Sequence, residues 1–132
     1  MKKKDALHGV NVAFIGAGAM GTAMLGGMLS RPTSAATRVS ASDRQQECLD
    51  TVRQQFGIQT TLDNTVAAKT AQVIVLSVKP QVLPSVLAEL RGHVKPGVLV
   101  VSIVAGATIR SIATGLEHEA VSYTHLTLPT KA

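Results

Sequence analysis

The stretch VNVAFIGAGAMG at residues 10–21 decides the fold, because an apolar run leads directly into the pattern G-x-G-x-x-G and a helical segment begins there. A buried strand that enters a helix through a glycine turn predicts a phosphate-binding unit. Gly16 permits the tight turn, Gly18 lets a pyrophosphate approach the backbone, and Gly21 allows helix and strand to pack closely. The amino end of the helix would offer unpaired N–H groups and the positive end of its dipole to phosphates.

Segments of strand and helix character alternate along the rest of the chain. The apolar runs predict strands at residues 38–41, 58–60, 73–78 and 98–103. Helical spacing and end signals predict helices at residues 19–30, 44–56 and 108–114, with two more through 66–68 and 82–90 and a polar loop at 33–36. This alternation predicts right-handed crossovers and one α/β domain, a Rossmann-type doubly wound parallel sheet.

Several local signals predict where the helices begin and end. Ser42-x-x-Gln45 has the form of a capping box for the helix at 44–56, which Gly57 would terminate. Asp63 or Asn64 would cap the next helix. Pro80 would occupy the first turn of the helix after the strand at 73–78.

Ser42-Asp43-Arg44 follows the second strand, about 20 residues past the last glycine, where this fold contacts the adenosine ribose of a dinucleotide. An acidic side chain there binds the ribose hydroxyls of NAD, whereas an arginine with small hydroxyl side chains suits the 2′-phosphate of NADP. Arg44 and Ser42 therefore predict NADP (as NADPH), while Asp43 leaves NAD open.

The composition is typical of a globular domain, with 132 residues of which 45% are hydrophobic and 16% charged. No apolar run reaches the ~18 residues of a membrane span, and the first residues lack the apolar core of a secretory signal, so we expect a cytoplasmic protein with no membrane partner. The single cysteine, Cys48, excludes an internal disulfide. The net charge of +5 is spread over scattered basic residues without an aromatic stacking platform, which argues against a nucleic-acid partner.

Three motifs in this order resemble the N-terminal domain of pyrroline-5-carboxylate reductase: IGAGAMG at 15–21, VKPQ at 78–81 and SIVAG at 102–106. The resemblance extends over residues 11–115. It implies reduction of the cyclic imine 1-pyrroline-5-carboxylate to L-proline by hydride from NADPH, the last step of proline biosynthesis. In the family a C-terminal helical dimerisation domain follows, which forms the homo-oligomer and the pocket for this small-molecule substrate, and this sequence lacks it.

The resemblance implies that the glycine loop contacts the pyrophosphate and that Ser42 and Arg44 contact the adenosine-phosphate end. It implies a further cofactor contact at Asn64 and places the loop at residues 77–80 beside the nicotinamide ribose. The residues are Ile15, Gly16, Ala17, Gly18, Ala19, Met20, Gly21, Ser42, Arg44, Asn64, Ser77, Val78, Lys79 and Pro80. No catalytic residue and no metal ligand is assigned. Lys79 is a candidate proton donor, but a positive charge directed at the cofactor ribose or phosphates is the favoured interpretation.

Residues 121–132 resemble no part of the family. We therefore expect an NAD(P)-binding domain at 1–120 and a tail at 121–132, in which VSYTHLTLPT looks like one translated frame of a sequencing-library adapter behind a truncated gene. A genuine terminal strand and loop is the alternative. Such a fragment would keep most of the cofactor site, lose the substrate site and be inactive alone.

Two other functions stay open from the sequence. The first is another NADP-dependent reductase with the same beginning, such as the prephenate, 6-phosphogluconate or deazaflavin-linked types, although the VKPQ and SIVAG motifs argue against these. The second is a non-catalytic dinucleotide-binding module, which would bind the cofactor without reducing a substrate.

Overall fold

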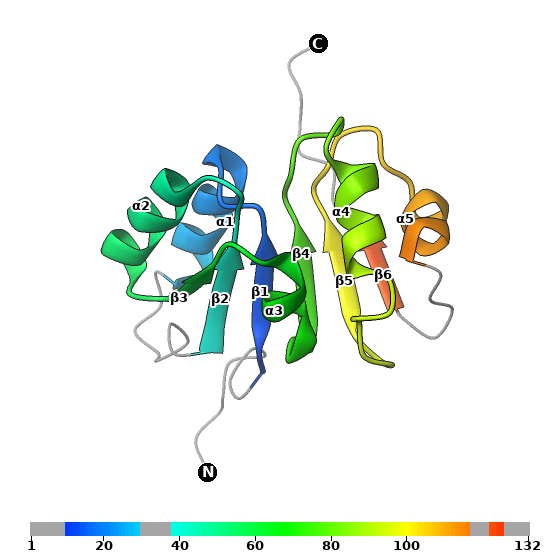
Figure 1. Ribbon diagram of the computed structural model, residues 1–132, viewed down its shortest axis with the longest axis horizontal. Coiled ribbons are helices and arrows are strands. Elements are labelled where there is room, and N and C mark those ends of the chain that lie inside the picture. The colour runs from blue at the N-terminus through cyan, green and yellow to red at the C-terminus, as the bar shows by residue number, and fades with distance from the viewer. Residues whose placement is uncertain (1–9, 30–37, 117–121, 126–132) are drawn as a thin grey trace.

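Strands and helices alternate through the part of the chain that the computed structural model describes, residues 10–29, 38–116 and 122–125. The strands are β1 (Val12–Ile15), β2 (Val39–Ser42), β3 (Gln59–Thr61), β4 (Val73–Leu76), β5 (Leu99–Ser102) and β6 (Ser122–His125). The helices are α1 (Ala19–Leu29), α2 (Gln46–Phe56), α3 (Asn64–Lys69), α4 (Leu83–Leu90) and α5 (Ile109–Leu116). These strands form one parallel sheet in the order β3-β2-β1-β4-β5-β6 (Figure 1), which confirms the predicted Rossmann-type doubly wound fold.

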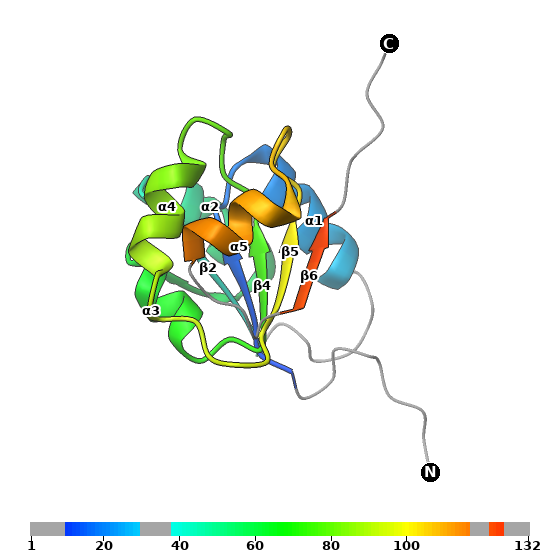
Figure 2. The same ribbon diagram turned by 90° about the vertical axis from the view of Figure 1, so that its right-hand side faces the viewer.

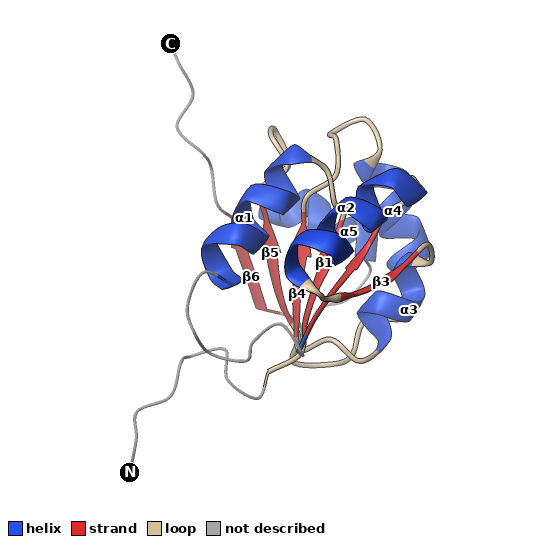
Figure 3. Ribbon diagram, turned by 90° about the vertical axis from the view of Figure 1, so that its left-hand side faces the viewer, coloured by secondary structure: helices blue, strands red, loops and turns tan. Residues whose placement is uncertain are grey.

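The sheet is covered on both faces, which explains why its central strands are apolar throughout. Successive side chains of β1 enter opposite layers. Phe14 packs in a buried cluster with Leu25 of α1 and Leu49 of α2. Ile15 belongs to the other cluster, which includes residues of α3, α4 and α5. Figures 2 and 3 show α1 on one side of the strands and α3 and α4 on the other.

The carboxyl ends of the four central strands lie at one level. Ile15 of β1 is paired with Ser42 of β2 and Leu76 of β4, and Leu76 is paired with Ser102 of β5. The loops that follow these strands therefore meet at one edge of the sheet. The helices that follow β1 and β2 pack on one face of the sheet, whereas those that follow β3, β4 and β5 pack on the other. The direction of the connections therefore changes between β1 and β4, and sheets of this kind bind ligands at such a point.

The helix starts differ from the sequence predictions at α2 and α4 and agree with them at α3. The capping box is wrong, because α2 begins at Gln46 after Gln45, which provides no side-chain cap, and Ser42 lies inside the sheet. Asp63 caps α3, with its carboxylate accepting from the Thr65 N–H, which confirms the first of the two predicted cap residues. Pro80 does not start α4: residues 79–82 form a separate turn, and Pro84 occupies the first turn of the helix.

Gly57 terminates α2 as predicted. It adopts φ +68°, and its N–H donates to the Arg53 carbonyl. The left-handed backbone that this bond requires is the conformation that glycine adopts without a Cβ penalty.

The alternative interpretation of the tail, a terminal strand, agrees with the structure at β6, which pairs in parallel with β5. The division at residue 120 and the origin of the tail residues stay predictions. The expected polar loop at 33–36 lies outside the described residues. Among the described helices, none has both the length and the apolar character needed to cross a bilayer.

The layered core yields a stability prediction. Leu25 is fully buried in the cluster beneath α1 and α2, whereas Leu62 is 56% exposed. Leu25→Ala should lower the free energy of unfolding by about 3 kcal/mol, since it removes apolar contacts and leaves a cavity. The matched control Leu62→Ala should change it by less than ~0.5 kcal/mol. Urea unfolding measures both, and equal effects of the two substitutions would contradict the proposed packing.

Candidate functional site

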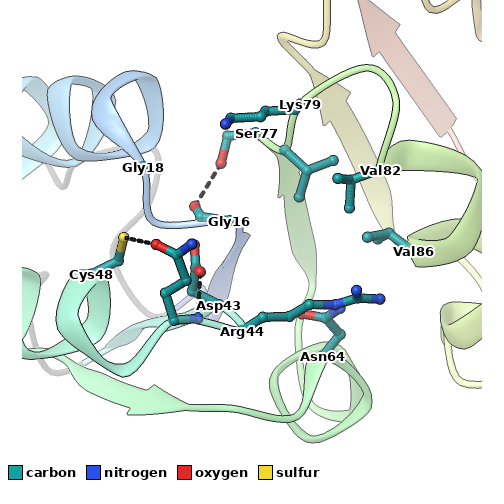
Figure 4. A pocket seen from close by; sticks show the side chains of 12 residues that line it. Gly16, Gly18, Asp43, Arg44, Cys48, Asn64, Ser77, Lys79, Val82 and Val86 are labelled. Atoms are coloured by element: carbon teal, nitrogen blue, oxygen red, sulfur yellow. Dashed lines mark hydrogen bonds between the residues drawn. The ribbon is translucent and has the colours of Figure 1, made fainter.

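A cavity of about 260 Å³ lies at the carboxyl edge of the sheet, between the loops that follow β1, β2 and β4 (Figure 4). The loops and the adjoining helices supply its walls. The lining residues are Gly16, Gly18, Asp43, Arg44, Gln45, Cys48, Asn64, Ser77, Val78, Lys79, Val82 and Val86.

The glycine loop is shaped by its contact with the end of β4. Gly16 has φ +107°, and a Cβ on it would lie 2.6 Å from the Ser77 carbonyl oxygen. A Cβ on Gly21 would lie 2.6 Å from the Gly16 carbonyl oxygen and 2.9 Å from the Ser77 hydroxyl. A side chain at either position would collide with the backbone of the neighbouring segment and force the two segments apart. Gly18 is different, because a Cβ there would meet no protein atom within 4 Å, so this residue leaves open space at the cavity wall.

Ser77 fastens the glycine loop to β4. Its hydroxyl donates to the Gly16 carbonyl oxygen at 2.7 Å, and its N–H donates to the Ile15 carbonyl at 2.9 Å. Gly16 is held from the other side as well, since its N–H donates to the Ser42 carbonyl at 2.8 Å. The turn therefore has bonds to both neighbouring strands of β1.

Asp43 connects the loops that follow β1 and β2. One carboxylate oxygen accepts from the Ala17 N–H at 2.8 Å and the other from the Gln45 N–H at 2.9 Å. Asp43 was absent from the predicted contacts, and sequence reasoning treated it only as a sign of NAD. The structure makes it part of the cavity wall and directs its carboxylate to the backbone.

Arg44 extends along the cavity in the direction of Asn64 (Figure 4). It is exposed, and within the described part of the chain its guanidinium makes no ion pair. A guanidinium in this state can bind an anionic ligand without first breaking a protein contact.

Asn64 is buried at 8% exposure, and each end of its amide has a partner. Its Oδ1 accepts from the Ser42 hydroxyl at 2.6 Å, and its Nδ2 donates to Glu89 Oε1 at 2.8 Å. Ser42 is fully buried, so its hydroxyl supports Asn64 from below the cavity and does not line the wall.

The cavity brings together half of the residues that the resemblance selected. Those that line it are Gly16, Gly18, Arg44, Asn64, Ser77, Val78 and Lys79. The others do not line it. Ile15 is a core residue, Ala17 is buried in the turn and Gly21 is buried at the start of α1. Ser42 lies beneath Asn64, and the exposed residues nearby are Ala19, Met20 and Pro80. The cofactor contacts themselves stay predictions.

Sequence reasoning missed five lining residues, namely Asp43, Gln45, Cys48, Val82 and Val86. Val82 and Val86 are four positions apart, so they share a face at the start of α4, and this spacing was the available signal. Nothing in the sequence indicated that their face borders the cavity as well as the core.

Cys48 is half-buried in the cavity wall, with its Sγ 3.7 Å from Gln45 Oε1. Burial raises the pKa of its thiol, and the negative charges of Asp43 and Glu47 raise it further. The thiol is therefore protonated at neutral pH and a poor nucleophile.

The rate of Cys48 alkylation by iodoacetamide tests this pKa direction. Followed from about pH 7 to about pH 10, the rate should inflect at a higher pH than that of an unstructured cysteine peptide, because only the thiolate reacts. Urea-unfolded protein provides the control. An inflection at the same pH in the folded and unfolded states would show that the cavity wall does not raise the pKa of the thiol.

The comparisons with known proteins agree with this geometry. A family model described as NADP oxidoreductase, coenzyme F420-dependent, matches residues 11–106. The pyrroline-5-carboxylate reductase of Methanosarcina acetivorans is 35% identical over 98 residues, which are 74% of this chain and 36% of that protein. The chain thus spans little more than a third of this curated relative.

Solved structures give the same result. That of a pyrroline-5-carboxylate reductase from Coxiella burnetii matches with a TM-score of 0.74 and 32% identity, over 81% of this chain and 40% of that one. The Plasmodium falciparum pyrroline carboxylate reductase, solved with NADP bound, is 20% identical with a TM-score of 0.73, over 87% and 41%, and shows the shared fold. The chain belongs to the NADP oxidoreductase family described as coenzyme F420-dependent, and within it resembles the N-terminal domain of the pyrroline-5-carboxylate reductases.

Proposed function

We propose that this chain is the cofactor-binding part of a pyrroline-5-carboxylate reductase and that NADPH binds in the cavity at the carboxyl edge of the sheet. The observation that carries the proposal is the glycine loop beside Arg44, with Gly18 leaving open space at the wall. The family match supports NADP as the cofactor, and the relatives' names support the substrate.

The chain's own residues fit a dinucleotide phosphate. The first N–H groups of α1 have no partner within the helix and could bind the pyrophosphate beside Gly18. The Ala17 N–H is already bonded to Asp43, so the groups from Gly18 onward would carry that contact. Arg44 would bind the 2′-phosphate. Its guanidinium makes no ion pair among the described residues, which favours NADP over NAD.

The chemistry then requires placement more than proton transfer by this domain. Bound NADPH would supply the hydride that reduces the C=N bond of 1-pyrroline-5-carboxylate to give L-proline. The loop at residues 77–80 would hold the nicotinamide ribose, and Lys79, exposed at the cavity mouth, would direct its charge toward the ribose or phosphates. The substrate pocket, a homo-oligomer and a cytoplasmic location would belong to the whole reductase.

Cofactor binding and substrate reduction are tested separately. Titration of the purified chain with NADPH, followed by nucleotide fluorescence, should saturate at one site per chain. A chimera in which residues 1–116 replace the matching part of the Coxiella burnetii reductase should oxidise NADPH only when 1-pyrroline-5-carboxylate is present. Binding without turnover in the chimera would favour the non-catalytic module, and absence of binding would refute the proposal.

The preference for NADP is tested by Arg44→Asp. A charge-assisted hydrogen bond contributes about 1.5–3 kcal/mol, so the Kd for NADPH should rise ~10- to 100-fold while that for NADH changes much less. Arg53→Asp makes the same charge change on α2, where Arg53 pairs with Asp50 outside the cavity, and should leave the NADPH-to-NADH ratio unaltered. Equal losses for the two cofactors in Arg44→Asp would contradict the assigned role.

A further inference from the structure

A chain of hydrogen bonds leads from the sheet through the cavity wall to α4. The Ser42 hydroxyl at the end of β2 donates to Asn64 Oδ1 at 2.6 Å, and Asn64 Nδ2 donates to Glu89 Oε1 at 2.8 Å. Ser42 and Asn64 are separated by 22 residues and Asn64 and Glu89 by 25, so three distant segments meet at one amide. That amide belongs to Asn64, which lines the cavity.

Glu89 is the member of this chain that determines the orientation of the amide. The two ends of an asparagine amide have nearly the same shape, so the hydrogen-bond partners decide which end points where. A serine hydroxyl can donate or accept and would satisfy either orientation, whereas an ionised carboxylate only accepts. Glu89 therefore requires the NH₂ group on its own side, and this leaves Oδ1 to receive the Ser42 hydrogen.

We propose that Glu89 is a positioning residue for the cofactor site: it holds Asn64 so that one remaining N–H and the Oδ1 edge are presented to the adenosine end of the dinucleotide. This inference rests on the proposed function. Arg44 extends toward Asn64 along the same wall (Figure 4), which places the amide at the end of the cavity where the adenosine phosphate would lie. Glu89 itself does not line the cavity, so it acts through Asn64.

The negative charge of Glu89 should weaken NADPH binding, whereas its hydrogen bond to Asn64 should strengthen it, so the test must separate the two effects. A carboxylate near the 2′-phosphate repels it, while the bond to Asn64 favours binding by holding the amide in place. Repulsion persists whatever residue occupies position 64. The positioning effect disappears once the Asn64 side chain is removed.

A double-mutant cycle on the Kd for NADPH separates them. We compare wild type, Glu89→Ala, Asn64→Ala and the double variant. Glu89→Ala should raise the Kd for NADPH by a certain factor when Asn64 is present and by a smaller factor when Asn64 is already Ala. The first factor should be about 3- to 10-fold larger than the second. Equal ratios in the two backgrounds overturn the inference.

Two further variants guard against a merely structural effect. Glu89→Gln keeps a carbonyl acceptor without the charge and should restore most of the affinity that Glu89→Ala loses. Glu47→Ala removes an exposed carboxylate of α2 that does not contact Asn64, and should show no coupling to Asn64→Ala. If Glu89→Gln binds as weakly as Glu89→Ala, the acceptor role is refuted.

The side-chain NH₂ signals of Asn64 in a ¹⁵N-correlated NMR spectrum provide a readout without cofactor. The proton bonded to Glu89 should lie downfield of its position in an exposed asparagine in wild type, and should move back toward that position in Glu89→Ala. Unchanged signals in Glu89→Ala overturn the inference even if NADPH binds normally. If wild type shows no NADPH binding, the proposed function fails and Glu89 loses its cofactor role, while the signals still report whether Glu89 holds the amide.

Discussion

The close approach of the glycine turn to the end of β4 is the constraint on which the rest of the site depends. A Cβ on Gly16 would lie 2.6 Å from the Ser77 carbonyl oxygen, and one on Gly21 would lie 2.6 Å from the Gly16 carbonyl oxygen. With no side chains in the way, the Ser77 hydroxyl can bond to the turn directly. The amino end of α1 is thereby held next to the end of β4, and Gly16 and Gly18 of the preceding turn line the cavity.

Around that turn, the polar groups at the edge of the sheet satisfy one another. The Ser42 carbonyl accepts from Gly16, and the Asp43 carboxylate accepts from Ala17 and Gln45. Buried or half-buried backbone groups need such partners, because leaving one unpaired costs about 1–3 kcal/mol. The result is a wall whose backbone is already fixed before any ligand arrives, which reduces the ordering cost of binding.

The hydrogen bonds of the wall explain how an acidic and a basic residue can lie side by side after β2, where the sequence predicts contact with the adenosine ribose. Asp43 is bonded to the backbone of two loops, while Arg44 is exposed and makes no ion pair among the described residues. The carboxylate is thus used to join the β1 and β2 loops, and the guanidinium is the group available to a phosphate. This difference supports NADP over NAD, although the two residues are adjacent in the chain.

Much of the fold could be predicted because its signals are local. The order of strand, glycine turn and helix, the apolar runs of the central strands and the αL stop at Gly57 depend on residues close together in sequence. The inward position of Ser42, the Asp43 bond to Ala17 and the partners of Asn64 depend on segments that lie 22 to 26 residues apart. A capping box and a buried strand end make the same local pattern, so only the packing of β2 between β1 and β3 decided which of them Ser42 serves. The sequence alone determined a parallel sheet with alternating strands and helices as far as α5, and the loop that would bind a phosphate, since backbone propensity and burial act along the chain. The tertiary structure decided that β6 joins this sheet and which polar atoms meet, because a hydrogen bond across the wall exists only after the strands have been brought into register.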